Sequence, residues 1–258
     1  MQRIFLVSHL KRSGGHAVTN WLQESEKDSV FFNNDIPVQP VLMGSASLPD
    51  KPPSFEDWTR RKPPDAARAI ARAGTLFVSV EDFGLDVSPF EHPAIVLIII
   101  LRDPENLFAS RIRKASSTSL KAYDYHDPAI LGRAVLLWKE HARVVLGLAH
   151  CPLPHIGVFY DAWLIGETYR EALAKVLGLS TLQRPSGQMT SEGGGSSFAD
   201  RTVDASSLRR RSDLLDEQES DVLRRIMSDP EMRELSAQTA TAVTRLVSGG
   251  EARSTRRP

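Results

Sequence analysis

The feature that most constrains the fold of this chain is the run of seven consecutive aliphatic residues Ile95–Leu101, with the sequence IVLIIIL. No polar residue interrupts the run, so a strand built from it is apolar on both faces. The run is far shorter than the roughly 20 apolar residues that a membrane-spanning helix needs. It therefore predicts a strand inside a parallel sheet that is covered on both faces.

Shorter apolar runs alternate with helical patterns along most of the chain. Strands are expected at residues 3–8, 75–80, 94–101 and 156–160. Helices are expected after Gly15, from Pro64 to Ala73, from Pro104, and at residues 128–149 and 168–177. This alternation predicts a three-layer α/β fold with a central parallel sheet. In such sheets, ligands bind at the carboxyl ends of the strands.

The 258 residues are enough to bury one sizeable core, and the pattern predicts a single domain over residues 1–248. Residues 35–64 are rich in Pro, Ser and Asp, which predicts an irregular insertion. Residues 180–213 are expected to form a Gly- and Ser-rich loop. Two short helices are expected at 214–227 and 230–247, followed by a disordered basic tail at 249–258.

The charges balance at 32 basic and 32 acidic side chains, which gives a net charge of zero. A protein that depends on general attraction to nucleic acid or to an acidic membrane is normally basic. Neither partner is expected, and any anion site must be local. The single cysteine, Cys151, and the lack of zinc-type Cys and His spacing argue against disulfides and a bound metal. The start of the chain lacks the pattern of a secretory signal, so a cytoplasmic location is expected.

The stretch from Ser8 to Leu22 has the pattern of a strand, a tight glycine turn and a helix. Such a turn aims several backbone N–H groups at one point, in line with the helix dipole, and this suits a phosphate-like anion. Lys11 and Arg12 add positive charge there. No lysine follows the second glycine, as the ATP-binding P-loop requires. On these residues alone, an ordinary strand-to-helix turn is an equal alternative.

A second candidate anion site follows the central strand. Arg102 stands at the strand's carboxyl end, Pro104 begins a helix, and Ser110 lies about two turns into that helix. The guanidinium and the hydroxyl could therefore flank one anion. By itself, an arginine at a strand end is more often part of a surface ion pair.

The first of these segments resembles a loop of the sulfotransferases that use 3′-phosphoadenosine 5′-phosphosulfate (PAPS). The sequence KRSGGH at residues 11–16 is similar to the loop that binds the 5′-phosphosulfate in that family. Arg12 falls on the family's basic residue, and Ser13-Gly14 matches directly. The chain departs from the family where Lys11 replaces the usual proline and where Gly15-His16 replaces hydroxyl residues.

The second segment extends the resemblance. Arg102-Asp103-Pro104 with Ser110 closely resembles the motif that holds the 3′-phosphate in this family. Residues 158–164, with a helix that ends at 176–179, are similar to a third family segment, and the order of all three agrees over about residues 3–200. The family's late Gly-rich loop corresponds to residues 192–198, where its usual basic residue is missing. The resemblance there points to Gly194, Ser196 and Arg201.

The resemblance implies transfer of the sulfuryl group from PAPS to a hydroxyl acceptor, with 3′-phosphoadenosine 5′-phosphate (PAP) as leaving group and no metal. It implies that the late-loop residues hold PAPS together with Lys11, Arg12, Ser13, Gly14, Gly15, His16, Ala17, Arg102 and Ser110. Like phosphoryl transfer, this reaction needs an in-line arrangement and positive charge at the leaving oxygen. Arg12 stays protonated and would supply charge, so Lys11 or His16 would deliver any proton.

An acceptor hydroxyl also needs a base within hydrogen-bond reach. Glu81 and Asp82 directly follow the strand at 75–80, at the sheet edge where the two anion segments converge. Glu81 is the expected base, and Asp82, His9 and His16 are the alternatives. The other interpretation of Glu81 and Asp82 is that they are solvated loop carboxylates or partners for Arg12.

Acceptor preference is expected to come from residues 35–61 and 116–127, whose polar character favours a carbohydrate or another polar small molecule over a flat phenol. The second segment contains four candidates for lining an acceptor cleft, namely Lys121, Tyr123, Tyr125 and His126. Trp58 is either a stacking platform for a ligand or a packing anchor.

Two other functions fit the same segments. One is a nucleotide kinase or NTPase with a divergent phosphate loop, and metal-dependent binding of ATP would favour it. The other is a non-catalytic relative that binds a nucleotide or glycan as a recognition module, and nucleotide binding without transfer would favour that.

Overall fold

Five parallel strands form the centre of the fold, in the spatial order β2-β3-β1-β4-β5. The computed structural model describes residues 2–36, 38–48, 50–116, 118–183 and 211–248. The strands are β1 (Arg3–His9), β2 (Ser29–Phe32), β3 (Thr75–Glu81), β4 (Ile95–Leu101) and β5 (His155–Phe159). The expected α/β class with a central parallel sheet is confirmed.

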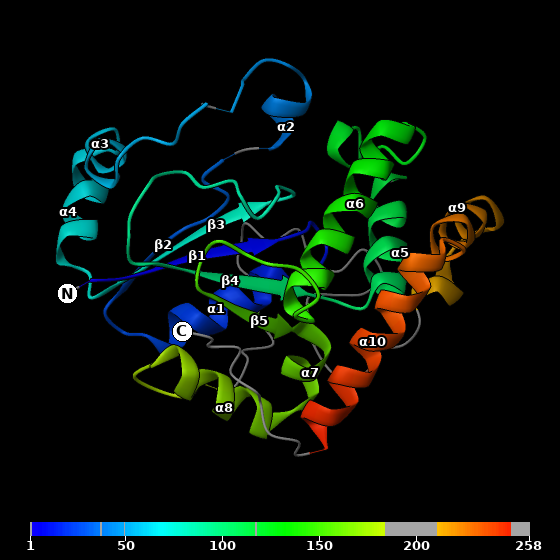
Figure 1. Cartoon of the computed structure of the whole chain (residues 1–258). Helices are drawn as coiled ribbons and strands as arrows, with labels where there is room; N and C mark the ends of the chain where they lie inside the picture. Colours follow the sequence, from blue (N-terminus) through cyan, green and yellow to red (C-terminus); the bar gives the residue numbers. More distant parts are fainter. Residues whose placement is uncertain (1, 37, 49, 117, 184–210, 249–258) are drawn as a thin grey trace.

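Helices flank this sheet (Figure 1). Those that precede β4 are α1 (Gly15–Ser25), α2 (Val38–Leu42), α3 (Phe55–Arg60) and α4 (Pro64–Arg72). Those that follow it are α5 (Pro104–Ala115), α6 (Pro128–Val145), α7 (Tyr160–Ile165), α8 (Glu167–Leu177), α9 (Glu217–Met227) and α10 (Pro230–Val247), with the short 3₁₀ turns η1 (Lys121–Tyr123) and η3 (Arg211–Leu214). None of the helices in the described ranges combines the length and the apolar character needed to cross a membrane.

Strand β4 is buried on both faces, as its uninterrupted aliphatic run predicts. Ile98 and Ile100 join the core cluster that includes side chains of α1, α5 and α8. Leu97 and Ile99 join the cluster on the other face, to which α3 and α4 contribute. Figure 1 shows α1 and α8 on one side of the sheet and α3 and α4 on the other. The sheet is therefore the middle layer of the fold.

Helices α5, α6 and α10 begin at an Asp-Pro pair, and this local signal makes their starts predictable. In each pair the aspartate is the N-cap and the proline is the first helical residue. The carboxylates of Asp103, Asp127 and Asp229 accept backbone N–H groups of the first turn at 2.8 to 2.9 Å. Proline fits the first helical position because its missing N–H would have no partner there.

The two C-terminal helices pack on helices that follow β4: α9 lies against α5, and α10 against α6 and α7 (Figure 1). Lys139 of α6 is almost buried, and its ammonium lies 2.7 Å from Asp229 and 3.3 Å from Glu231 at the start of α10. Arg143 donates to the same Glu231. These pairs fix the beginning of α10 against α6.

The strand order places a topological switch point between β1 and β4. Helix α1 leaves β1 toward the edge that holds β2, whereas the chain leaves β4 toward β5 at the opposite edge. In parallel α/β sheets, ligands bind beside the carboxyl ends of such a pair of strands. The loop after β1 and the residues after β4 meet at this point, and both predicted anion segments are there.

Three local elements differ from the sequence-based expectations. Residues 29–32 form β2, which was not expected because four half-buried edge residues carry little periodic signal. The 35–64 segment is not wholly irregular, since it contains α2 and α3. Tyr160 begins α7 instead of ending β5, because the chain turns directly from the strand into a helix.

Trp58 is the packing anchor of the 35–64 segment and not a stacking platform. It is buried, stacks on Phe55, and packs against Phe90 at a ring separation of 4.5 Å. Its indole N–H donates to Asp35 at 2.8 Å, and the ammonium of Lys62 lies 4.3 Å from its ring centre. Its ring also meets Phe32 of β2 edge to face at 5.4 Å, and this contact attaches the segment to the β2 edge of the sheet.

We expect Trp138→Phe to lower the free energy of unfolding by about 2–4 kcal/mol, measured by urea denaturation. Trp138 of α6 is fully buried, and its indole N–H donates to the carbonyl of Arg102 at 3.0 Å, so the change removes a buried hydrogen bond and leaves a cavity. The control is Leu136→Ala on the same helix, where the side chain is 66% exposed and a change within about 0.5 kcal/mol is expected. Equal losses in the two variants would contradict the prediction.

Candidate functional site

The candidate site lies at the carboxyl edge of the sheet, where the ends of four neighbouring strands meet. The loop at residues 10–14 follows β1, Glu81 ends β3, Arg102 follows β4, and Tyr160 follows β5. The structure therefore brings together the loop, the carboxylates and the strand-end arginine that the sequence predicts at one edge.

The loop between β1 and α1 has the backbone of an anion cradle. Arg12 and Gly14 adopt left-handed conformations, with φ of 71° and 86°, on either side of Ser13. Gly14 is the N-cap of α1, and its carbonyl accepts the N–H groups of Ala17 and Val18. The N–H groups before Ala17 thus lie at the positive end of an eleven-residue helix that has no acidic residue in its first turn. This arrangement suits a phosphate-like group.

Both glycines of the loop allow close approaches. A Cβ at Gly14 would lie 2.1 Å from the ring of Tyr160, and a Cβ at Gly15 would lie 2.3 Å from Nδ1 of His9. Gly14 also holds the positive φ that residues with a side chain rarely adopt. The two positions let the loop pack directly between the ends of β1 and β5.

Arg102 is buried, and part of its guanidinium has no partner among the described residues. Nη1 donates to the carbonyl of Arg12 at 2.9 Å, and the guanidinium lies 5.0 Å from the ring centre of Tyr160. Nε and Nη2 are buried and have no hydrogen-bond partner in the described ranges. Arg102 is only 3% exposed, so it is not in a surface ion pair. Unsatisfied buried donors on a cation are costly, which points to an anionic ligand.

Ser110 is fully buried and receives a hydrogen bond from Arg211, the first residue of η3. The backbone N–H of Arg211 donates to the Asn106 side chain at 3.1 Å. Burial, reinforced by the charges of Arg102 and Arg12, lowers the pKa of Arg211 to about 9. Arg102, Ser110 and Arg211 thus form one cluster that contains two buried guanidinium groups.

The sequence did not identify Arg211. The signal that could have found it is the run of three arginines at residues 209–211, just before the first C-terminal helical pattern. The late-loop candidates Gly194, Ser196 and Arg201 lie outside the described residues.

Glu81 is not a solvated loop carboxylate. It is 8% exposed, it is ion-paired with Lys11, and its Oε1 lies 3.8 Å from Nδ1 of His9. Burial alone would raise the pKa of Glu81, but the charges of His9 and Lys11 outweigh it, and the net pKa is below the usual value. Glu81 is therefore ionised near neutral pH, which is the state that a general base requires.

Asp82 is engaged in the loop structure, so its role differs from that of Glu81. Its two oxygens accept from Arg111 at 2.8 and 3.0 Å, and Oδ1 also accepts the backbone N–H of Lys11 at 2.9 Å. Burial by itself would raise the pKa of Asp82. Arg111 and Lys11 outweigh that effect, so the net pKa is below the usual value. This buried ion pair assigns Asp82 to holding the loop and not to proton transfer.

The two candidate histidines lie next to each other in the site. The rings of His9 and His16 meet edge to face with 6.1 Å between their centres. His9 is buried, and burial is the main reason why its pKa is below the usual value. Its Nε2 is buried and has no partner in the described part of the chain. His9 lies beside Glu81 at the same edge and stays an alternative to it as the base.

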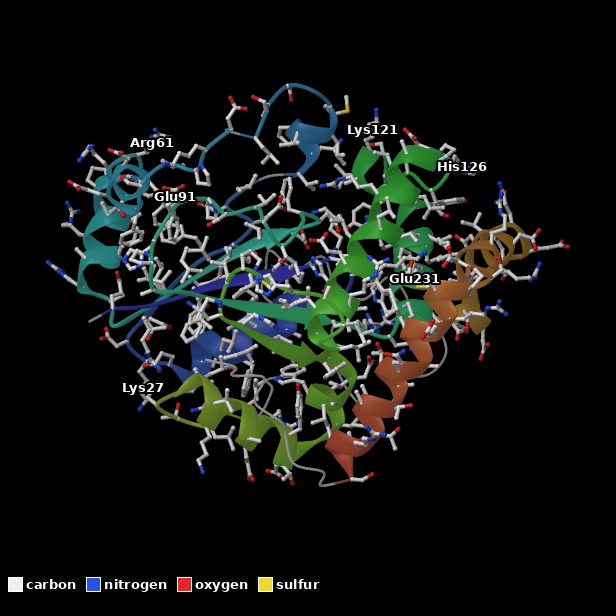
Figure 2. All side chains as sticks on the ribbon, viewed as in Figure 1. Lys27, Arg61, Glu91, Lys121, His126 and Glu231 are labelled. Carbon is white, nitrogen blue, oxygen red and sulfur yellow. The ribbon has the colours of Figure 1, made fainter. Side chains whose placement is uncertain are left out.

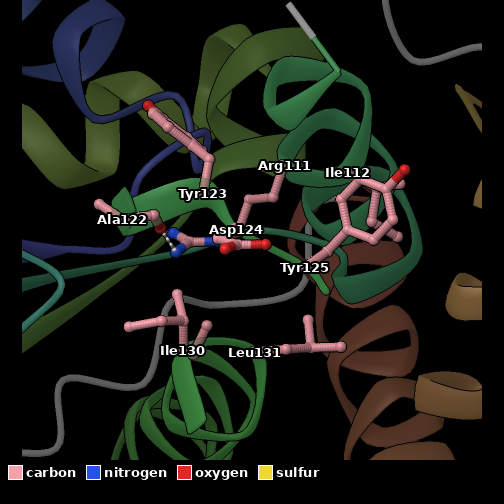
Figure 3. Close-up of a pocket in the computed structure, with 9 residues that line it drawn as sticks. Arg111, Ile112, Ala122, Tyr123, Asp124, Tyr125, Ile130 and Leu131 are labelled. Carbon is pink, nitrogen blue, oxygen red and sulfur yellow. Dashed lines mark hydrogen bonds between the residues drawn. The ribbon is translucent and has the colours of Figure 1, made fainter. Parts of the chain in front are cut away.

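Side chains of residues 116–127 line two different cavities, and neither is the single acceptor cleft that was expected. Tyr123 lies over the guanidinium of Arg111 at 5.6 Å, and burial and Glu81 raise its pKa. Residues 122–125, with α5 and α6, line a cavity of about 10 Å³, which holds about one water molecule and is no acceptor cleft (Figure 3). Tyr125 and His126 line a separate pocket of about 370 Å³ against α9. Lys121 and His126 both lie toward the outside of the molecule in Figure 2.

In the described ranges, no group of three His, Cys, Asp or Glu side chains is placed to hold a metal ion. The residues that the site offers to a ligand are cations, backbone N–H groups, hydroxyls and one buried ionised carboxylate. This set can bind a molecule with two anionic groups and can take a proton from a third group at the Glu81 side.

We expect Gly14→Ala to lower the free energy of unfolding by at least about 2 kcal/mol more than Gly147→Ala. Both glycines have positive φ, 86° and 74°, so both variants carry the backbone strain of about 1 kcal/mol. Nothing lies within 4 Å of a Cβ at Gly147, whereas a Cβ at Gly14 meets the Tyr160 ring. Urea denaturation of the two variants measures the difference, and equal costs would show that the loop does not pack against Tyr160.

The chain matches no known family model and no curated protein sequence. Its function must therefore be argued from the site itself.

Proposed function

We propose that this protein transfers the sulfuryl group of PAPS to a hydroxyl acceptor and releases PAP. The observation that carries the proposal is the buried Arg102, whose Nε and Nη2 lack partners among the described residues. Its charge acts on Arg211, which donates to Ser110. A buried cation with unused donors at the switch point of a parallel sheet calls for an anionic ligand. The resemblance to PAPS-dependent sulfotransferases over residues 3–200 is the basis for the ligand class and the P-loop-like fold that we propose.

Two adjacent anion sites support a ligand with two phosphate groups. Arg102, Ser110 and Arg211 would hold the 3′-phosphate. Arg12, Lys11 and the backbone N–H groups of residues 13–17 would hold the 5′-phosphosulfate. The two sites are linked directly, because Nη1 of Arg102 donates to the carbonyl of Arg12. A single adenosine bisphosphate can thus satisfy both sites.

PAPS supplies an activated sulfuryl group that is bonded to a phosphate oxygen. During transfer, a bond forms between the sulfur and the acceptor oxygen while the bond between the sulfur and the phosphate oxygen breaks. Arg12 and the loop N–H groups stabilise the charge that develops on the leaving phosphate. Glu81 accepts the proton of the acceptor hydroxyl, and Lys11 or His16 donates any proton that the leaving phosphate needs.

Lys11 and Glu81 form one ion pair, so a proposed proton donor and the proposed base are in direct contact. The pair also separates two sides of the site. The donor side is built by the ends of β1, β4 and β5, and the acceptor side by the end of β3 together with η1. Glu81 and Tyr123 are polar side chains on the acceptor side, which agrees with a carbohydrate or another polar small molecule as acceptor.

We expect PAP to bind with micromolar affinity and Arg102→Ala to weaken that binding about 10- to 150-fold, the loss of a charge-assisted hydrogen bond of roughly 1.5–3 kcal/mol. Calorimetric titration of both proteins with PAP and with AMP is the measurement. AMP lacks the 3′-phosphate, so its affinity should be the same in both proteins. An unchanged PAP affinity in the variant would remove the 3′-phosphate assignment, and a preference of the native protein for ATP with magnesium would favour a kinase or NTPase.

We expect Glu81→Gln to cut turnover with labelled PAPS by about 10²-fold or more while PAP affinity changes less than about threefold. The variant keeps the shape of the side chain but removes its negative charge and its capacity to take a proton. Full activity would exclude Glu81 as the base. PAP binding by the native protein without transfer to any hydroxyl compound in a broad acceptor screen would instead favour the recognition module.

A further inference from the structure

Arg111 occupies a central position in the site that the proposed chemistry does not use. It directly follows Ser110 in α5 and is 5% exposed. Its guanidinium donates to both carboxylate oxygens of Asp82, to the carbonyl of Lys11 at 3.3 Å and to the carbonyl of Ala122 at 3.0 Å. One side chain thus contacts the end of β3, η1 and the loop at residues 10–14, which we call the anion loop.

The contacts of Arg111 with Asp82 and Lys11 fix the anion loop. Asp82 accepts the backbone N–H of Lys11, and Arg111 donates to the backbone carbonyl of the same residue. Both backbone groups of Lys11 are therefore held by one buried ion pair. Asp82 is held in turn by its left-handed backbone, with φ of 61°, and by Arg133, which donates to its carbonyl. The position of the loop next to Arg12 depends on this pair.

The contact of Arg111 with Ala122 fixes η1 on the acceptor side. Figure 3 shows the Arg111 side chain reaching from α5 to the carbonyl of Ala122 in η1. The N–H of Ala122 donates to the side chain of Gln39 in α2 at 2.9 Å. Ala122 is therefore held from two directions, and Tyr123 follows it with its ring 5.6 Å from the Arg111 guanidinium. The cavity between η1 and α5 is only about 10 Å³, so the segment has little room to shift.

Only a guanidinium can make these contacts together. Its planar fork offers five N–H donors in fixed directions. Nη1 contacts both oxygens of Asp82 and the carbonyl of Lys11, while Nη2 donates to the carbonyl of Ala122. A lysine at this position keeps the charge opposite Asp82 but has a single ammonium group, which cannot reach Lys11 and Ala122 at once. Replacement by lysine therefore keeps the positive charge of Arg111 and removes the hydrogen bonds that join Lys11 to Ala122.

We propose that Arg111 is a positioning residue that couples the anion loop to the Lys121–Tyr123 segment, so that a ligand bound in the loop also orders the acceptor side. The assignment of donor and acceptor sides rests on the proposed function. The coupling itself is a property of the chain without a ligand, so it is tested separately from that function.

The test compares amide hydrogen exchange in the native protein, Arg111→Lys and Arg113→Lys, with and without PAP. Arg113 is a matched control, because it lies on the same helix and is also ion-paired, to Glu219 at 3.1 Å, but its side chain is 42% exposed and lies outside the loop contacts. Without ligand, Arg111→Lys should speed exchange at least tenfold both in residues 11–15 and in Lys121–Tyr123. Arg113→Lys should leave both segments unchanged. Gln39→Ala should loosen only Lys121–Tyr123.

PAP supplies a readout that a purely structural role of Arg111 would not change. In the native protein, PAP should slow exchange in residues 11–15 and also in Lys121–Tyr123. In Arg111→Lys, the protection of Lys121–Tyr123 should disappear while some protection of residues 11–15 remains. If Arg111→Lys does not fold, Asp82→Asn takes its place, because asparagine keeps the shape of aspartate and tolerates the left-handed backbone.

The coupling is overturned if only one segment loosens in Arg111→Lys, or if the long-range protection by PAP survives in that variant. A native protein that binds no PAP would contradict the proposed function. The exchange rates measured without ligand would still decide whether Arg111 links the two segments.

Discussion

At the carboxyl edge of the sheet, the buried guanidinium groups of Arg102 and Arg211 lie close to that of the half-buried Arg12. Burial, and then the charges of Arg102 and Arg12, lower the pKa of Arg211, and burial also lowers that of Arg12. Buried cations persist only where hydrogen bonds or opposite charges compensate them. The carbonyl of Arg12 and the hydroxyl of Ser110 supply part of that compensation. A dianionic ligand would add to that compensation, so its binding should stabilise the surrounding elements.

The packing around this cluster explains why its geometry is fixed. Gly14 lets the loop touch the ring of Tyr160, and Tyr160 in turn lies against the guanidinium of Arg102. The carbonyl of Arg102 accepts a hydrogen bond from the buried Trp138, which ties the site to the core between α6 and the sheet. On the other side, Arg111 connects the loop to η1. The loop is held by strands, helices and side chains that are far apart in the sequence.

Local signals made a large part of the fold predictable. The uninterrupted aliphatic run predicted a strand buried on both faces, and it is β4 of the parallel sheet. The helix starts expected at Pro104, Pro128 and Pro230 are the first residues of α5, α6 and α10. The short edge strand β2 and the helices α2 and α3 were missed, because segments of four to six residues bury too little to impose a period. The strand-end Arg102 was found, and its burial contradicts only the alternative of a surface ion pair, because burial depends on neighbours that are distant in the sequence.

The sequence by itself determined the α/β class and the edge of the sheet at which the loop, Glu81 and Arg102 meet. These follow from chain order, since all parallel strands present their carboxyl ends to one edge. Only the tertiary structure decided the partners of the charged groups. Asp82 is bound to Arg111, Lys11 to Glu81, and Ser110 to Arg211. Each pair joins residues that are distant in the sequence, and their pairing depends on burial and packing that no local pattern encodes.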